Sequence, residues 1–132
     1  MSDFRKLEVW RKAHALALNI HRTAVRIRGS NYAGFRSQLI RSSMSIPTNI
    51  VEGNGQRSRA EFGRFVGVAL NSSSELEYHL IIARDTKLIS ASDFAALSEQ
   101  TIQVRKMLYG LLRHIKSESF RKGGKTGPDA VV

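Results

Sequence analysis

Hydrophobic positions near the start of the chain recur at the spacing of a helix, and they cover an unusually wide arc. From residue 4 to residue 28 they share one side of a helical projection and leave charged residues on the other. The arc consists of Val9, Ala13, Leu16, Ile20, Ala24 and Ile27, extended by Trp10, Ala17, His21, His14, Leu7, Val25 and Leu18. It is about 200° wide, whereas an outer helix needs roughly 100° to cover a core. We therefore expect this first helix to bury one face in the monomer and a second face against a partner subunit.

The stretch from Gln38 to Gly53 predicts an inner helix, which follows a turn at residues 29–34 and continues to about Asn54. It carries two apolar rows separated by roughly a quarter-turn, at about 100° per residue. The first row contains Phe35, Leu39, Ile46 and Ile50 with the small residues Ser42, Ser43 and Gly53, and the second contains Ile40, Met44 and Val51. Two rows indicate two neighbours, and the small residues allow a close approach by another helix.

Pro47 lies inside this predicted inner helix. It removes one amide donor, and its ring crowds the carbonyl of Ser43. Two structures fit: a helix that stops near Ile46, and a continuous helix with a kink. The continuous helix is favoured because the apolar spacing stays in phase through Ile50, and nearby hydroxyls can satisfy a freed carbonyl.

Two further helices are predicted in the second half of the chain. The third opens at Ser58 with the form of a capping box, Ser58-Arg59-Ala60-Glu61, and the fourth follows a break at residues 87–92, capped by Ser90 or Ser92. The stripe of the third contains Phe62, Phe65, Val66, Ala69, Ser73, Leu76, Leu80 and Ala83. The stripe of the fourth contains Leu97, Val104, Leu108, Leu111 and Ile115, with Phe94 and Leu112 beside it.

Gly63 and Gly67 lie on another side of the third helix. A glycine inside a helix costs about 1 kcal/mol relative to alanine, so two glycines four residues apart favour a flat surface that another backbone approaches. The alternative is sequence drift on a solvated face.

The four predicted helices define the fold class. Helices of roughly 22–28 residues with short links are typical of an all-α, up-down-up-down four-helix bundle, which we place at residues 1–116. Residues 117–132 are polar and rich in glycine, so we expect a flexible, disordered tail. Deleting residues 118–132 is expected to preserve folding and assembly.

Charge and composition narrow the functional classes. The net charge is +10, and residues 1–59 hold 11 basic and 3 acidic residues, against 7 and 6 in residues 60–116. This asymmetry favours a basic face that binds a polyanion over a charge that only maintains solubility. The chain has no cysteine for disulfides or thiolate metal sites, and it contains no apolar run of the roughly 20 residues that span a bilayer. Neither a signal peptide nor a membrane partner is expected, and the expected location is cytoplasmic.

The candidate phosphate contacts are cations outside the apolar arcs. They are Arg5, Arg11, Lys12, Arg22, Arg26, Arg57 and Arg59. An all-helical chain has no aromatic sheet surface for reading single-stranded bases, so binding is expected to depend on shape and charge.

Motifs for catalysis and metal binding are missing from the sequence. Di-iron bundles need Glu-x-x-His pairs on two helices, and this chain has none; Glu75 and His79 have no matching pair elsewhere. Gly53-Asn54-Gly55 is too short for a phosphate-binding loop. We expect a protein that is not an enzyme and needs no metal or cofactor.

Several motifs together resemble a known family. They are Leu7-x-Val9-Trp10, Gln38-Leu39-x-Arg41, Ser45-Ile46-x-x-Asn49-Ile50-x-Glu52-Gly53, Glu61-Phe62-x-x-Phe65 and Ser74-Glu75-Leu76-Glu77. Over residues 4–116 the chain is similar to the four-helix-bundle proteins encoded within intervening sequences of bacterial 23S ribosomal RNA genes. The resemblance implies a homopentameric ring. It also implies a distant relationship to the accessory protein of diversity-generating retroelements, a basic pentamer that binds its reverse transcriptase and template RNA.

Four polar positions fall within these motifs: Arg41, Asn49, Glu52 and Glu75. We expect them to be structural, with Arg41 bridging to Glu75 or Glu77 across the second and third helices, because half-buried charges must pair.

Two functional hypotheses follow. The first is a non-enzymatic, oligomeric nucleic-acid-binding protein that acts on RNA rather than DNA within a ribonucleoprotein. The second is a scaffold that docks a nucleic-acid-handling enzyme such as a reverse transcriptase, with incidental RNA contact.

Overall fold

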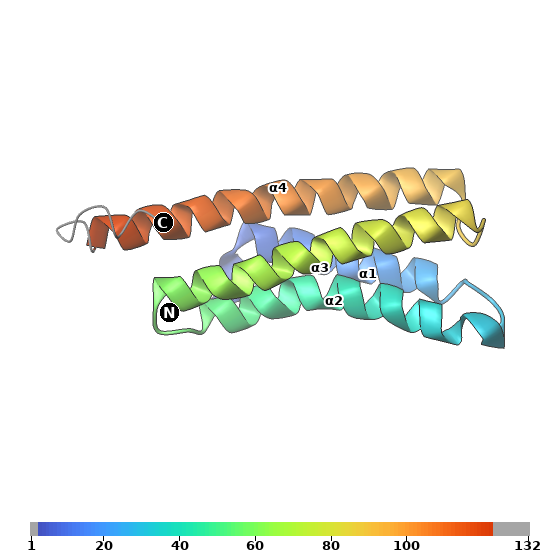
Figure 1. Cartoon of the computed structure of the whole chain (residues 1–132), viewed down its shortest axis with the longest axis horizontal. Helices are drawn as coiled ribbons and strands as arrows, with labels where there is room; N and C mark the ends of the chain where they lie inside the picture. The colour runs from blue at the N-terminus through green and yellow to red at the C-terminus, as the bar shows by residue number, and fades with distance from the viewer. Residues whose placement is uncertain (1–2, 123–132) are drawn as a thin grey trace.

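Four antiparallel helices form the predicted bundle in the computed structural model, which describes residues 3–122 (Figure 1). They are α1 (Glu8–Ala24), α2 (Ala33–Asn54), α3 (Arg59–Asp85) and α4 (Ala91–Lys122), with the short 3-10 helices η1 (Phe4–Lys6) and η2 (Ser30–Tyr32). Helix α1 packs against α2 and α4, and α3 packs against the same two helices, so α1 and α3 are diagonal. The fold class predicted from the sequence is confirmed.

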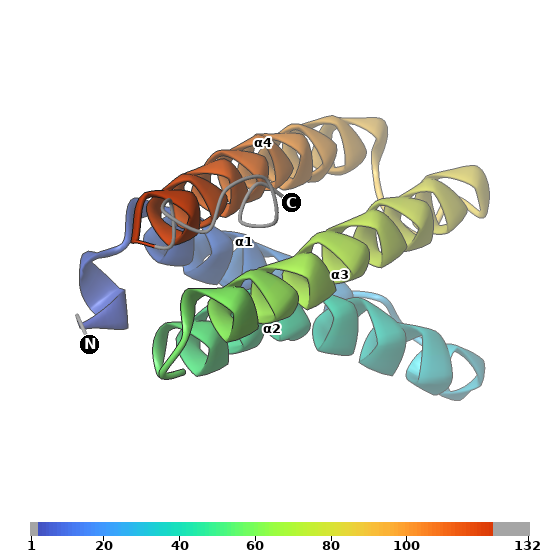
Figure 2. The ribbon, with the colours of Figure 1, turned by 60° about the vertical axis from the view of Figure 1, so that its left-hand side comes forward.

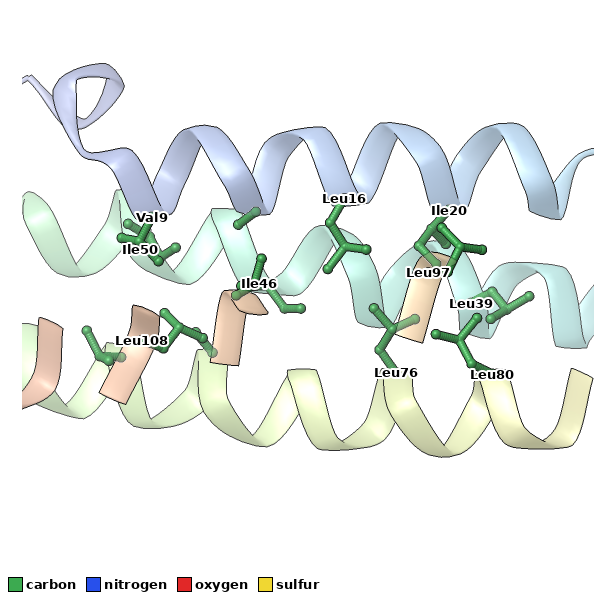
Figure 3. Packing of buried hydrophobic residues seen from close by; sticks show 14 of the residues in the cluster. Val9, Leu16, Ile20, Leu39, Ile46, Ile50, Leu76, Leu80, Leu97 and Leu108 are labelled. Carbon is green, nitrogen blue, oxygen red and sulfur yellow. The ribbon is translucent and has the colours of Figure 1, made fainter. Parts of the chain in front are cut away.

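Residues of all four helices meet in one core along the bundle axis (Figure 3). The predicted stripes supply its main side chains, and Leu16, Ile46, Leu76 and Leu108 are fully buried. The hydroxyl side chains of Ser73 and Thr101 are also buried in this core, and each keeps a hydrogen bond. Ser73 donates to the carbonyl of Leu70, and Thr101 donates to that of Leu97. Small side chains that bond their own helix let the helices approach closely.

The first predicted helix is too long at both ends. Leu7 is extended and separates η1 from α1, so η1 stands apart from α1 at the N-terminal end (Figure 2). The side chain of Asp3 accepts from the amide of Arg5, and Phe4 packs edge-on against Trp10 at 5.0 Å. These contacts stabilise a separate turn. Helix α1 ends at Ala24, before the reversal at Gly29, whose φ of 106° favours glycine.

Helix α2 continues through Pro47, which confirms the continuous helix rather than a stop near Ile46. The neighbouring hydroxyls, however, do not bond the carbonyl of Ser43 as expected. Ser42 and Ser43 lie about one turn before the proline. Ser42 donates to the carbonyl of Gln38, and Ser43 donates to that of Ile40.

Both predicted serine caps are present. The Ser58 hydroxyl accepts from the amide of Glu61 at 3.1 Å and begins α3. The Ser90 hydroxyl accepts from the amide of Asp93 at 3.0 Å, so Ser90 rather than Ser92 caps α4. Each bond satisfies an amide that the first helical turn leaves free.

The glycines of α3 are not approached by another backbone within the monomer. A Cβ on Gly63 would meet only side chains of α4, at 3.5 Å from Leu112 and 3.8 Å from Ile115, and Gly67 faces open space. The close helix approach lies instead at Gly53 of α2, next to Phe62 and Phe65 of α3.

Helix α4 continues to Lys122, beyond the boundary predicted at residue 116 (Figure 1). Glu118 on this extension forms an ion pair with Arg59 at the start of α3. Those side chains are 23% and 35% exposed, so the pair is shielded from water on most of its surface. The last part of the predicted tail, residues 123–132, lies outside the described residues.

The Glu118 ion pair predicts a measurable contribution to stability. Glu118→Ala is expected to lower the free energy of unfolding by about 1 kcal/mol, because it leaves the partly buried guanidinium of Arg59 without its carboxylate. A loss of that size lowers the Tm by roughly 4 °C in a domain of this length. Thermal unfolding followed by circular dichroism checks this.

Glu52→Ala is the matched control, since Glu52 is exposed and its carboxylate makes no hydrogen bond or ion pair within the described chain. If both variants melt with the parent, the contact between the two helix ends adds nothing, and the original expectation for deletion of residues 118–132 stands.

Candidate nucleic-acid interface

Most arginines of the described chain are already paired with a carboxylate. These ion pairs are Arg5–Asp3, Arg11–Glu8, Arg26–Asp93, Arg41–Glu75, Arg59–Glu118, Arg64–Glu61, Arg84–Asp85 and Arg105–Glu77. A paired cation has less charge to offer a phosphate than a free one. Whether a cation is paired therefore distinguishes the candidate phosphate contacts better than its position in the sequence does.

The two arginines nearest the N-terminus are held in a local network. Arg5 lies 3.0 Å from the Asp3 carboxylate, and its hydrogen bonds hold the pKa of Asp3 below its ordinary value. Arg11 pairs with Glu8 at 2.5 Å and donates to the carbonyl of Arg5 at 2.9 Å. Both side chains remain exposed, but their charges are partly neutralised.

Two other predicted contacts connect helices. Arg26 of α1 pairs with Asp93 of α4 at 3.0 Å. Arg59 pairs with Glu118 and lies over the Phe62 ring at 5.7 Å, with its Nε atom buried. The structure therefore gives Arg59 a role in holding α3 to α4, which differs from the predicted phosphate contact.

Lys12, Arg22 and Arg57 are the predicted contacts that remain without a carboxylate partner. Arg22 donates to Asn19, whose amide in turn donates to Gln100 of α4. Lys12 and Arg57 are exposed and make no hydrogen bond or ion pair with any described residue. Lys12 and Arg22 both lie on the polar side of α1, whereas Arg57 lies in the link between α2 and α3.

Three free cations of α4 were missed by the sequence reasoning: Lys106, Arg113 and Lys116. All three are exposed, and none is paired with another described residue. The signal was their spacing of seven and three residues in a stretch, residues 100–117, that contains no Asp or Glu. Because the charges of residues 60–116 nearly balance, a count over that whole region did not reveal this stretch.

Two of the four polar motif positions, Arg41 of α2 and Glu75 of α3, lie on a polar seam between these helices. The predicted bridge from Arg41 to Glu75 is present, although both side chains are substantially exposed. Glu77 pairs instead with Arg105 at 2.9 Å. Asn49 donates to the carbonyl of Ser45 at 2.7 Å, which supports its structural role.

The seam also contains a direct side-chain bond between the helices, because the hydroxyls of Ser45 and Ser72 are 2.7 Å apart. Glu52 faces solvent, and no contact in the described chain supports the structural role predicted for it.

An apolar groove of about 510 Å³ lies between α1 and α2. Its lining residues are Phe4, Trp10, His14, Ala17, Leu18, His21, Met44, Pro47, Thr48 and Val51. Leu18 is 42% exposed and Met44 is 54% exposed, although both are large apolar residues. The groove therefore contains much of the second face of α1 that the sequence assigns to a partner, together with part of the second apolar row of α2.

The described residues contain no group of three or more His, Asp or Glu side chains placed to hold a metal ion. None of their helices combines the length and apolar character that a bilayer crossing requires.

Comparisons with known proteins place this bundle in a family. Curated proteins gave no match. The chain is similar to a crystal structure of a protein of unknown function from the S23 ribosomal protein family of Bacteroides thetaiotaomicron VPI-5482. The TM-score is 0.74 at 25% sequence identity, over 79% of this chain and 97% of that one. A family model described as 23S rRNA-intervening sequence protein matches residues 5–110. The chain therefore belongs to the 23S rRNA-intervening sequence protein family.

Proposed function

We propose that this protein is a non-enzymatic, basic RNA-binding protein that works as a homo-oligomer within a ribonucleoprotein. The observation that carries the proposal is the surplus of exposed cations without a carboxylate partner, on a chain with a net charge of +10. Such cations release counterions when they meet phosphates, which gives binding that depends on salt and little on sequence. The family description, which refers to a 23S rRNA-intervening sequence, supports RNA over DNA.

The groove between α1 and α2 supports the oligomer. It exposes Leu18 and Met44 beside Trp10, and burying such side chains against a second copy removes apolar area from water. A ring of five copies is the assembly implied by the family resemblance. In any closed ring the free cations repeat around the assembly, so weak phosphate contacts add into a multivalent surface.

The same groove also fits the scaffold hypothesis, in which it receives a nucleic-acid-handling enzyme. In that case the purified protein alone would bind bare RNA weakly at every salt concentration. The two functions are therefore separable with one purified component.

Neutralising free and paired cations in matched pairs tests the RNA-binding proposal. Lys12→Gln with Arg22→Gln removes two free charges of α1, and Arg64→Gln with Arg84→Gln removes two that already face Glu61 and Asp85. The first variant is expected to bind a labelled RNA about tenfold more weakly than the parent at about 0.1 M salt. The second loses the same net charge and is expected to bind within about twofold of the parent.

Fluorescence anisotropy gives the affinities, and circular dichroism with light scattering verifies helicity and mass. Equal binding by the parent and the α1 variant would show that these charges serve solubility. Equal losses in both variants would show that only the total charge matters.

A further inference from the structure

One face of α4 carries a straight row of five exposed side chains: Ile102, Lys106, Tyr109, Arg113 and Lys116. We call this row the α4 stripe. Its spacings of four, three, four and three residues keep all five on one side of the helix. At a rise of about 1.5 Å per residue the stripe is about 21 Å long. Large apolar side chains alternate with cations along it, and Ile102 and Tyr109 are 38% and 49% exposed.

The charges of the α4 stripe are not neutralised by the rest of the bundle. No Asp or Glu occurs in residues 100–117. The other cation of that stretch, Arg105, turns towards α3, where it binds the Glu77 carboxylate at 2.9 Å and the carbonyl of Ser73 at 3.1 Å. No hydrogen bond or ion pair joins a stripe side chain to any other described residue. The stripe therefore presents three free positive charges to an external anion.

Tyr109 lies in the middle of these charges with its ring open to solvent. Lys106 and Arg113 are one turn away on either side of it. The next residue, Gly110, has no side chain to cover the helix surface, and a Cβ built there would meet only the Arg113 guanidinium, at 3.8 Å. Within the described chain, no aromatic ring or cation stacks on Tyr109. An exposed aromatic ring between free cations is the pattern that proteins use to stack a base while holding the adjacent phosphates.

We propose that the α4 stripe is a binding site for unpaired RNA, in which Lys106, Arg113 and Lys116 contact phosphates and Tyr109 stacks on an unpaired base. The inference rests on the proposed RNA-binding function and adds the class of RNA that is bound. Bases inside a duplex are stacked on one another and cannot cover the ring, so the ring selects loops, bulges or single strands. An acidic protein segment is the competing occupant, because it would also satisfy the three cations.

Two exposed tyrosines give a matched test of stacking. Tyr109→Leu keeps an apolar side chain but removes the aromatic face, and Tyr78→Leu makes the same change on α3, where Tyr78 is 61% exposed. Stacking of one base predicts that Tyr109→Leu weakens binding of a single-stranded RNA oligonucleotide about tenfold. The same variant is expected to bind a blunt RNA duplex as the parent does. Tyr78→Leu is expected to match the parent on both RNAs.

The charges are tested by a triple variant, Lys106→Gln, Arg113→Gln and Lys116→Gln. On single strands, loss of three phosphate contacts makes the fall of log K with log salt shallower by about 2 units for each bound stripe. Tyr109→Leu is expected to leave that slope unchanged. Light scattering of every variant gives the mass of the assembly. A smaller assembly in the triple variant would make the stripe a contact between subunits and overturn the proposal.

The failures of the two proposals are distinguishable. If the parent binds RNA and the Lys12/Arg22 variant is weakened, but both α4 variants bind single strands as the parent does, only the α4 proposal is overturned. It is also overturned if Tyr109→Leu weakens duplex and single-strand binding equally. If the parent binds neither RNA, the general RNA-binding function fails and the α4 proposal fails with it.

Discussion

Gly53→Ala is expected to destabilise the bundle by about 1–2 kcal/mol, although alanine is the better helix former. A Cβ at position 53 would lie 2.8 Å from Cδ1 of Phe62 and 2.9 Å from Cβ of Phe65. The Phe65 Cβ is fixed to the α3 backbone, so relief requires the two helices to separate. Phe62 is buried and has little room to rotate away. Overpacking of this kind costs about 1–3 kcal/mol, and a gain of up to about 1 kcal/mol in helix propensity offsets part of it.

Gly67→Ala is the matched control in the same bundle. A Cβ there meets nothing within 4 Å, so only the propensity term remains and the variant is expected to gain up to about 1 kcal/mol. Chemical unfolding of the three proteins measures both changes. If Gly53→Ala is as stable as Gly67→Ala, the close approach of α2 to α3 is not what retains glycine at position 53.

The double variant Leu18→Glu with Met44→Glu is expected to convert the proposed oligomer into a folded monomer. Both side chains line the apolar groove between α1 and α2 and are exposed in the monomer, so the substitutions need not disturb the core. In the assembly they would bury two carboxylates against an apolar partner surface, at a cost of several kcal/mol for each unpaired charge. Light scattering at micromolar concentration gives the mass, and circular dichroism gives the helix content.

Val68→Glu with Tyr78→Glu serves as the control for the groove, because both residues are exposed apolar positions on α3. These substitutions are expected to leave the mass unchanged. An intact assembly after the groove substitutions, or a monomer after the control substitutions, would place the subunit contact elsewhere.

The sequence predicts the architecture well because the bundle core follows a local rule. A helix needs only apolar residues at its own periodic positions, and positions such as Leu39, Ile46 and Leu76 are buried where the projection puts them. The ends of the helices depend on contacts outside that rule. Phe4 leaves the first helix to pack on Trp10, and the extension of α4 carries Glu118 to a partner that the periodic pattern does not reveal.

The candidate interface was less predictable for a related reason. Net charge is additive and can be counted, but the availability of a cation depends on which carboxylate reaches it across the bundle. Arg26 pairs with Asp93 from another helix, and Arg59 pairs with Glu118 in the same way. A count of charges by region therefore overestimated how available both arginines are to a phosphate. Conversely, the carboxylates that balance the second half lie outside residues 100–117, so the same counting hid the cations of the α4 stripe.

The salt dependence of RNA binding by the purified parent protein tests the central claim most directly. Titrations of a labelled single-stranded RNA between about 50 and 200 mM salt are expected to show affinity falling by about 300-fold or more, as six or more phosphate contacts on a single strand require. The bound species is expected to have the mass of an oligomer carrying RNA. Affinity that is undetectable at about 50 mM salt, or that stays constant across this range, would contradict an RNA-binding role for the free cations.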